Sequence, residues 1–237
     1  THSHEQRRLA GLFAQCGDFE AAFALLRDSW QQPPTADADL EQLLDLAAAA
    51  HAWAYIRDLP IASLMASSDP ATRINAIDTR ATALRKLGHN AEAYALYRSA
   101  PHDGNRLARA QLAQSLGHYA ESAALWAQLL EQNPNDISWR RSQAYALLKA
   151  GRTTEAETHY RRLVADKAAS HADRVQLAWL LNSKGQYAEA WAILAALPMP
   201  HTQLSILEIQ ARTAFWAGDM AAAVPLLKAL LTRKEEG

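Results

Sequence analysis

The sequence has few cysteines, almost no net charge and no long apolar run, and each of these absences excludes a class of protein. Cys16 is its one cysteine among 237 residues, so no disulfide can form within the chain. Its formal net charge is −1, with 24 basic and 25 acidic residues, which gives no overall field to attract nucleic acid or anionic lipid. No apolar run reaches the roughly 18 residues that a membrane-spanning helix needs. We therefore expect no nucleic-acid partner and no direct membrane insertion of this segment.

Sequence motifs for catalysis and for cofactor binding are also missing. The chain has no His-Glu-x-x-His, no Gly-x-Ser-x-Gly and no phosphate-binding glycine-rich loop. Cys16 has no evident histidine partner, and we expect it to be buried, because a free cysteine behaves as a small hydrophobic residue. We therefore predict a non-enzymatic chain with no catalytic residues, no cofactor and no metal site.

Glycine and proline are few, nine of each, and they fall mostly at regularly spaced joints. Gly117, Gly151, Gly185 and Gly218 follow one another at intervals of 34, 34 and 33 residues. Each glycine ends one apolar run and precedes another. A fixed period of this length with two helices per repeat predicts a solenoid.

The run after Gly117 shows the helical pattern most clearly. Tyr119, Ala123, Trp126 and Leu129 recur at the 3-and-4 spacing of one helix face. Pro134 then ends the run, because proline cannot continue a helix. No strand-like alternation persists in the chain, so the predicted class is all-α.

The glycine spacing divides the whole chain into units. Gly17 and Gly88 are 71 residues apart, about twice the period, and His51 lies 34 residues after Gly17. We therefore expect a degenerate second unit in which His51 has replaced the joint glycine. The result is a single array over residues 1–237 with seven units, at about 3–36, 37–73 (degenerate), 74–102, 103–136, 137–170, 171–203 and 204–237.

Prolines predict where individual helices are irregular. Pro60 lies inside the expected second helix of the degenerate unit, so we expect a kinked or split helix between residues 52 and 66. Pro101 should end the second helix of the third unit near Ser99. Pro225 is expected near the first turn of the last helix, where proline is tolerated.

The units resemble those of the tetratricopeptide repeat family. That family has a glycine at the joint, an aromatic residue two positions later, then a small residue, a bulky residue and often a closing proline. The fourth unit carries these as Gly117, Tyr119, Ser122, Trp126 and Pro134. The first and sixth units repeat the pattern with Gly17, Phe19, Ala22 and Leu26, and with Gly185, Tyr187, Ala190 and Leu194.

The resemblance implies an α-solenoid of about seven helix pairs in a right-handed superhelix, with the first helix of each pair on the concave wall. In the last three units the slots that face the concave groove carry aromatic, arginine and asparagine side chains, which are candidates for partner binding. They are Arg141, Tyr145, Trp179, Asn182, Arg212 and Phe215. For Trp179 and Phe215 the alternative is packing between helices.

The same slots differ in the second and third units. They carry Glu41, Asp45, Asp78 and Arg85, a more acidic wall. The lysine and asparagine with which some relatives clamp a terminal carboxylate are missing here, since Arg7 and Gly11, then Asp78 and Thr82, stand at those places. A terminal-carboxylate clamp is therefore not predicted.

From this reading we predict a scaffold that binds a protein or extended peptide in its concave groove. One alternative is the periplasmic repeat region of a bacterial protein of exopolysaccharide export or assembly that recruits enzymes. Another is a regulatory peptide-sensing domain, and a third is an array that flanks a catalytic domain. We expect the segment to be part of a longer chain, and the sequence leaves open whether it works in the bacterial periplasm or cytoplasm.

Overall fold

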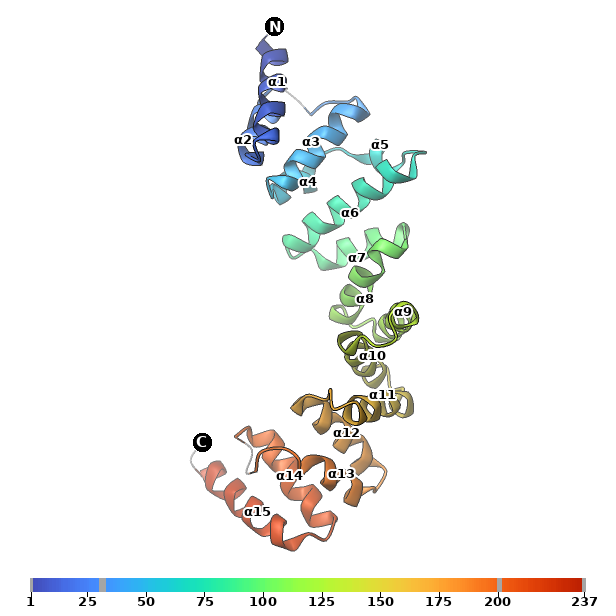
Figure 1. Ribbon diagram of the computed structural model, residues 1–237, viewed down its shortest axis with the longest axis vertical. Coiled ribbons are helices and arrows are strands. Elements are labelled where there is room, and N and C mark those ends of the chain that lie inside the picture. The colour runs from blue at the N-terminus through green and yellow to red at the C-terminus, as the bar shows by residue number, and fades with distance from the viewer. Residues whose placement is uncertain (1, 30–32, 200–201, 236–237) are drawn as a thin grey trace. The chain divides into compact units, whose positions relative to one another are not determined.

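The protein is described by a computed structural model of residues 2–29, 33–199 and 202–235 (Figure 1). In these ranges every regular element is a helix, and no strand occurs. The helices fall into two compact units, Thr1–Gly117 and His118–Gly237. The predicted all-α solenoid of helix pairs is confirmed. That the two units continue one another as a single right-handed superhelix stays a prediction.

The first unit runs from α1 to α8. Within it α2 packs against α1 and α3, and α6 packs against α4, α5 and α7 (Figure 1). Its elements are α1 (His2–Gln15), α2 (Phe19–Asp28), α3 (Asp37–Ala49), α4 (Trp53–Asp58), α5 (Ala62–Met65), α6 (Pro70–Lys86), α7 (Asn90–Ser99), the short 3-10 helix η1 (Asp103–Asn105) and α8 (Arg106–Ser115).

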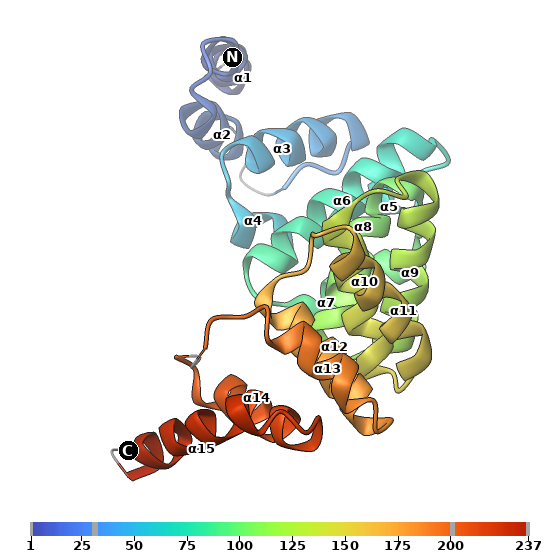
Figure 2. The same ribbon diagram turned by 60° about the horizontal axis from the view of Figure 1, so that its bottom comes forward.

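The second unit runs from α9 to α15. Within it α10 packs against α9 and α11, α13 packs against α12 and α14, and α12 also contacts α14. Figure 2 shows α14 and α15 side by side. Its helices are α9 (Tyr119–Gln132), α10 (Ile137–Lys149), α11 (Thr153–Ala165), α12 (His171–Ser183), α13 (Tyr187–Leu194), α14 (Leu204–Trp216) and α15 (Met220–Glu235).

Gly151 shows why the joints favour glycine. Its φ of 79° lies in the left-handed region, which residues with a Cβ rarely adopt. Its N–H donates to the Leu148 carbonyl at 3.1 Å, and the Arg152 N–H donates to the Leu147 carbonyl at 2.9 Å. This pair of bonds satisfies the last carbonyls of α10 and turns the chain toward α11.

His51 makes the same joint without glycine. It has a φ of 55°, its N–H donates to the Ala48 carbonyl at 3.1 Å, and the Ala52 N–H donates to the Ala47 carbonyl at 2.8 Å. The joint that the sequence places at His51 is therefore present. Lys167, with a φ of 55°, forms another non-glycine joint between α11 and α12 that the sequence did not reveal.

The predicted irregularity at Pro60 is confirmed. Instead of one second helix, the chain forms α4 and α5, separated by extended backbone at Leu59. The Leu59 carbonyl accepts the Ile61 N–H at 2.9 Å and a second hydrogen bond from Nη2 of Arg80 on α6. Leu59 and Ile61 are both buried, so the break packs against its neighbours.

Two further prolines can be compared with their predictions. The second helix of the third unit ends at Ser99, two residues before Pro101, as predicted. For Pro225 the prediction was wrong, because α15 begins at Met220 and Pro225 lies in its second turn. Proline has no N–H there to donate to the carbonyl of Ala221, so one helical hydrogen bond is lost.

Small residues lie where the two helices of a pair approach each other. The residue five positions after each joint glycine is fully buried, and its small side chain lets the helix backbones come close. These residues are Ala22, Ala93, Ser122, Ala156, Ala190 and Ala223.

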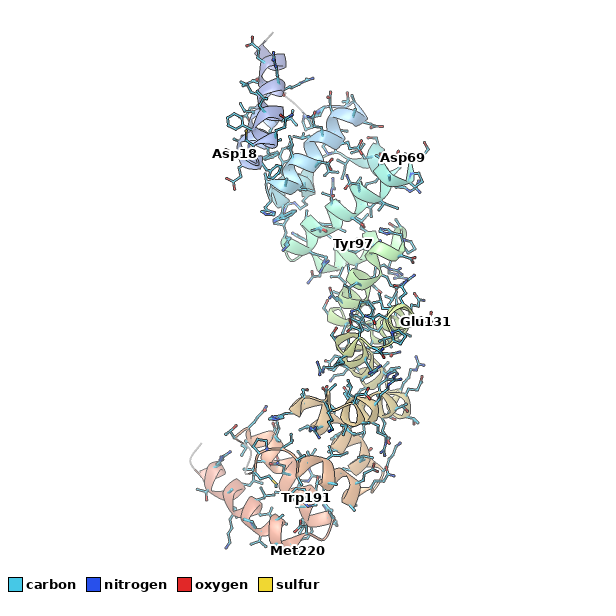
Figure 3. All side chains as sticks on the ribbon, in the orientation of Figure 1. Asp18, Asp69, Tyr97, Glu131, Trp191 and Met220 are labelled. Carbon is cyan, nitrogen blue, oxygen red and sulfur yellow. The ribbon has the colours of Figure 1, made fainter. Side chains whose placement is uncertain are left out.

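Polar contacts also hold neighbouring helix pairs together. Trp191 of α13, labelled in Figure 3, donates from Nε1 to Oδ2 of Asp219 at 2.9 Å. The other oxygen of Asp219 accepts the Ala222 N–H at 3.0 Å, within the first turn of α15. One carboxylate therefore connects α13 to the joint between α14 and α15.

Candidate functional site

A groove of about 780 Å³ runs over the first helices of the second unit. It is lined by α10, α12 and α14 together with the start of α13, and α12 contacts α14. The side chains that matter most for its chemistry are Lys149, Trp179, Asn182, Tyr187, Arg212 and Trp216.

The helical period explains why these side chains face the groove. On α12 the groove residues Gln176, Trp179 and Ser183 recur every three or four positions, on one face of the helix. The intervening Leu177 and Leu181 are buried on the other face. The same helix thus supplies both the core and the groove.

Trp179 lies in the groove with 52% of its surface exposed. The structure therefore places it on the groove wall and not between packed helices, which was the alternative reading of the sequence. A large aromatic side chain that is half exposed in a hollow has apolar surface left to bury against a partner. That it anchors a partner stays a prediction.

Arg212 also lies in the groove, one helix away on α14, and its side chain is exposed. Among the described residues its guanidinium has no hydrogen bond and no ion pair. Glu208, one turn earlier on α14, lines the groove as well, and the two side chains are not within ion-pair distance. The groove therefore contains an arginine and a carboxylate that do not neutralise each other.

Two of the other candidate residues tie neighbouring first helices together. Arg141 of α10 donates from Nε to Oδ2 of Asp173 at 2.7 Å and from Nη2 to the Ala168 carbonyl at 3.0 Å. Asn182 of α12 donates from Nδ2 to Oγ1 of Thr213 at 2.7 Å. Asn182 lies in the groove lining, whereas Arg141 lies outside it. Both have structural partners, and a role in binding stays a prediction.

Tyr145 and Phe215 lie outside the groove lining and remain partly exposed, at 36% and 43%. The ring of Tyr145 meets Tyr119 edge-on at 6.2 Å between centroids, and Lys149 lies 5.6 Å from its centroid. Phe215 meets Trp216 edge-on at 5.4 Å. Each of these rings thus contacts one residue of the groove lining, Lys149 or Trp216.

The sequence reasoning missed Trp216 and Tyr187. Trp216 is 60% exposed, and its ring stacks on Tyr187 with centroids 5.9 Å apart. Tyr187 is the aromatic residue two positions after Gly185 in the repeat motif, and it was not among the candidate binding residues. Trp216 follows Arg212 by four residues on the same helix face, and this spacing was the signal that could have found it.

The layer of second helices carries a buried carboxylate, Glu157. Its two oxygens accept hydrogen bonds from Arg161 Nε at 2.7 Å and Lys184 Nζ at 2.6 Å. Burial alone would raise the pKa of Glu157, but the hydrogen bonds from Lys184 and Arg161 hold it below its ordinary value. Arg161 also donates hydrogen bonds from both terminal nitrogens to the two carboxylate oxygens of Glu189 on α13. These bonds join α11 to α13 and to Lys184 at the end of α12.

The acidic side chains expected on the concave wall of the first unit form hydrogen bonds within the chain. Glu41 accepts a hydrogen bond from Oγ1 of Thr72 at 3.2 Å, and Asp45 accepts one from Nδ2 of Asn75 at 3.0 Å. Both bonds connect α3 to α6. Arg85 is half-buried on α6.

Asp78 is also engaged. Its Oδ1 lies 3.1 Å from Nε2 of His102, which connects α6 to the segment before η1. The acidic wall expected from the sequence is thus part of the packing between repeats.

In residues 2–29, 33–199 and 202–235 no group of three or more histidine, cysteine or acidic residues could hold a metal ion. No helix in the described part of the chain is long and apolar enough to cross a membrane. Cys16 is exposed, so the prediction that it is buried was wrong. It stands at the end of α1, beside the joint at Gly17, where the turn faces solvent.

The sequence matches no protein-family model and no curated protein. Solved structures are similar in fold. One is a tetratricopeptide repeat protein from Parabacteroides merdae, with 17% identity over 98% of this chain and 93% of that chain, and a TM-score of 0.51. Another is a chain in the structure of Naa15/Naa10 bound to HypK-THB, with 13% identity and a TM-score of 0.60. There the match covers 98% of this chain and 37% of the other, so this protein spans just over a third of that chain's length.

At these identities the likeness concerns the fold. Helix pairs, joint glycines and buried small residues recur at the period that the sequence shows, and the resemblance to tetratricopeptide repeat proteins is confirmed at that level. Each of the two units therefore consists of stacked helix pairs with a fold similar to that of tetratricopeptide repeats.

Proposed function

We propose that this protein is a non-catalytic scaffold that binds a protein or extended peptide in the groove over α10, α12 and α14. The observation that carries the proposal is the exposure of Trp179 and Trp216, beside an unpaired Arg212, in one hollow of about 780 Å³. Tryptophan and arginine are the residue types most enriched where binding energy concentrates, and this volume is within the usual range for ligand sites.

The dimensions of the groove fit a short extended segment. Packed helices lie about 8–10 Å apart, so the path across two helix-to-helix intervals, from α10 to α14, is about 16–20 Å. An extended chain advances about 3.3 Å per residue, so about five or six residues cover that path. A side chain from every second residue then faces the groove wall.

Narrower roles stay predictions. Recruitment of enzymes during exopolysaccharide export, and sensing of a signalling peptide, both need a groove of this kind. No contact among the described residues favours one over the other.

The test is a selection of binders from a displayed library of random seven-residue peptides, using the full chain as bait. We expect peptides that bind the wild type and lose binding to Trp179→Ala. The matched control is Leu231→Ala, which removes an equally exposed apolar side chain from α15, outside the groove, and should leave binding unchanged. Binders that are equally retained by Trp179→Ala would refute the groove as the binding surface.

A further inference from the structure

We infer that the groove selects a peptide segment with a single side-chain carboxylate, which pairs with Arg212. An apolar side chain two positions away in the same segment packs on Trp179 and Trp216. This inference rests on the proposed function and names the chemistry of the partner. It follows from the guanidinium of Arg212, which has no ion pair among the described residues, and from the exposed surface of the two tryptophan rings.

The first observation is the contrast between Arg212 and other arginines of the same unit. Arg141, Arg152 and Arg161 each hold a carboxylate of the chain within 2.7 Å of a guanidinium nitrogen. Arg212 holds none among the described residues, although it lies in the groove. A guanidinium presents paired N–H groups that match a carboxylate, so the missing partner is best supplied by a carboxylate of the ligand.

The second observation limits the ligand to one acidic group. Lys149 and Arg212 carry positive charge in the groove lining, and Glu208 carries negative charge. The balance of these three groups is one positive charge. A single carboxylate neutralises it, whereas a run of acidic residues would bring further carboxylates close to Glu208 and be repelled.

The third observation gives the spacing within the ligand. Trp179 and Arg212 lie on the neighbouring first helices α12 and α14 that the peptide crosses, and packed helices lie about 8–10 Å apart. In an extended peptide, residues on the same side are two positions apart, at about 6.6 Å. The acidic residue and the apolar residue of the ligand are therefore separated by one residue.

The carboxylate is that of a side chain within the segment. The groove extends over α10, α12 and α14, and its lining continues past Arg212 to Trp216, so a segment that fills it does not end at Arg212. Arg7, Gly11, Asp78 and Thr82 stand where a clamp for a terminal carboxylate has lysine and asparagine.

The experiment uses the full chain and a library of random seven-residue peptides with amidated C-termini, so that terminal carboxylates cannot contribute. Wild-type binders should be enriched in one Asp or Glu, two positions from a large apolar residue. Replacing that acid by its amide in the best binder should weaken binding about tenfold or more. Arg212→Glu should cause a similar loss and should instead prefer the same peptide with lysine at the acidic position.

Lys228→Glu is the matched control for Arg212→Glu. Lys228 is exposed on α15, outside the groove, and the substitution makes the same change in net charge. It should leave both the affinity and the peptide preference unchanged. Arg212→Gln, which removes the charge without reversing it, repeats the measurement if the glutamate variant does not fold.

The outcomes separate the two proposals. Binders that depend on Trp179 but carry no acid, or that ignore Arg212→Glu, overturn this inference and leave the proposed function in place. A library that yields groove binders only when the C-terminus is free also overturns it. Binders that depend on neither Trp179 nor Arg212 overturn the proposed function itself.

Discussion

The two units use equivalent positions of their first helices in different ways. In the first unit Glu41 and Asp45 on α3 accept hydrogen bonds from α6, so these acidic side chains hold neighbouring repeats together. In the second unit Trp179 and Arg212 occupy such positions and remain exposed in a groove. A side chain at a position that the repeat geometry turns toward the concave face is therefore a candidate for binding only when no other residue of the chain already bonds to it.

The second unit shows both uses within a few residues. Asn182 bonds to Thr213 across α12 and α14, as Asp45 bonds to its partner across α3 and α6. Trp179, on the same helix as Asn182, has no such bond and contributes apolar surface to the groove. On α12 the short polar side chain ties two helices and the large aromatic one stays exposed, whereas arginine does either: Arg141 is bound to Asp173 and Arg212 is open.

The largest expected effect separates the groove from the core of the same helix. Leu181→Ala removes a fully buried side chain of α12 and should lower the free energy of unfolding by about 2–5 kcal/mol. Trp179→Ala, two residues earlier, should cost about 1 kcal/mol or less, because the ring is half exposed. Urea denaturation of both variants measures the difference. Equal losses would show that Trp179 belongs to the core.

Glu157→Gln should have the next largest effect. It removes the charge that holds Arg161 and Lys184, and a loss of about 1–2 kcal/mol is expected. The pKa of Glu157 is below its ordinary value of 4.5 in the folded protein. Its contribution is therefore fully present above about that pH and is lost as the pH falls through the lower, folded-state pKa.

The measurement is the free energy of unfolding as a function of pH for the wild type and Glu157→Gln. The difference between them should shrink below the ordinary pKa. Glu155→Gln is the control, because the Arg152–Glu155 pair is exposed on both sides and should contribute little. A constant difference from pH 7 to strongly acidic pH would contradict the assigned role of Glu157.

Hydrogen exchange compares the irregular repeat of the first unit with the regular repeats of the second. The amides of residues 51–73 include two short helices and the break at Pro60, so many of them lack a helical hydrogen bond. We expect their protection to be about tenfold lower than that of residues 137–194. Equal protection would mean that the buried Leu59 and Ile61 hold this segment as firmly as a regular helix pair.

The smallest expected effect compares two joints. Gly151→Ala forces a residue with a Cβ into the left-handed region and should cost about 1 kcal/mol, since nothing else lies within 4 Å of the added atom. His51→Gly should do the reverse and stabilise by up to about 1 kcal/mol. Part of that gain is offset by the loss of the ring contact between His51 and Trp53 at 5.2 Å. Thermal unfolding of both variants checks the signs, and a destabilised His51→Gly would show that this ring contact outweighs the strain.

The sequence predicts the fold well because the fold depends on local features that repeat. The joint at His51 follows from the period alone, and the break at Pro60 follows from the chemistry of one residue. Lys167 could not be found in this way, because its joint lies between repeats and has no glycine. The exposure of Cys16 was missed because a lone cysteine carries no signal of which way its helix faces.

The site is less predictable, because it depends on which side chains find partners across helices. Trp179 and Arg212 were found from their slots, and the structure leaves both open. Arg141 occupied an equivalent slot but is bound to Asp173, a pairing that spans 32 residues of sequence. Trp216 and Tyr187 form their stack between different helices, and only the folded chain brings them together.

The most direct test of the central claim is a paired measurement on Trp179→Ala. The affinity of the best selected peptide and the thermal midpoint are measured on the same preparation, with Leu231→Ala as control. A groove anchor predicts that binding weakens by about 2 kcal/mol or more while the melting temperature changes little. Unchanged affinity, or weakened affinity that is matched by a large loss of stability, would contradict the assignment of this groove as the recognition surface.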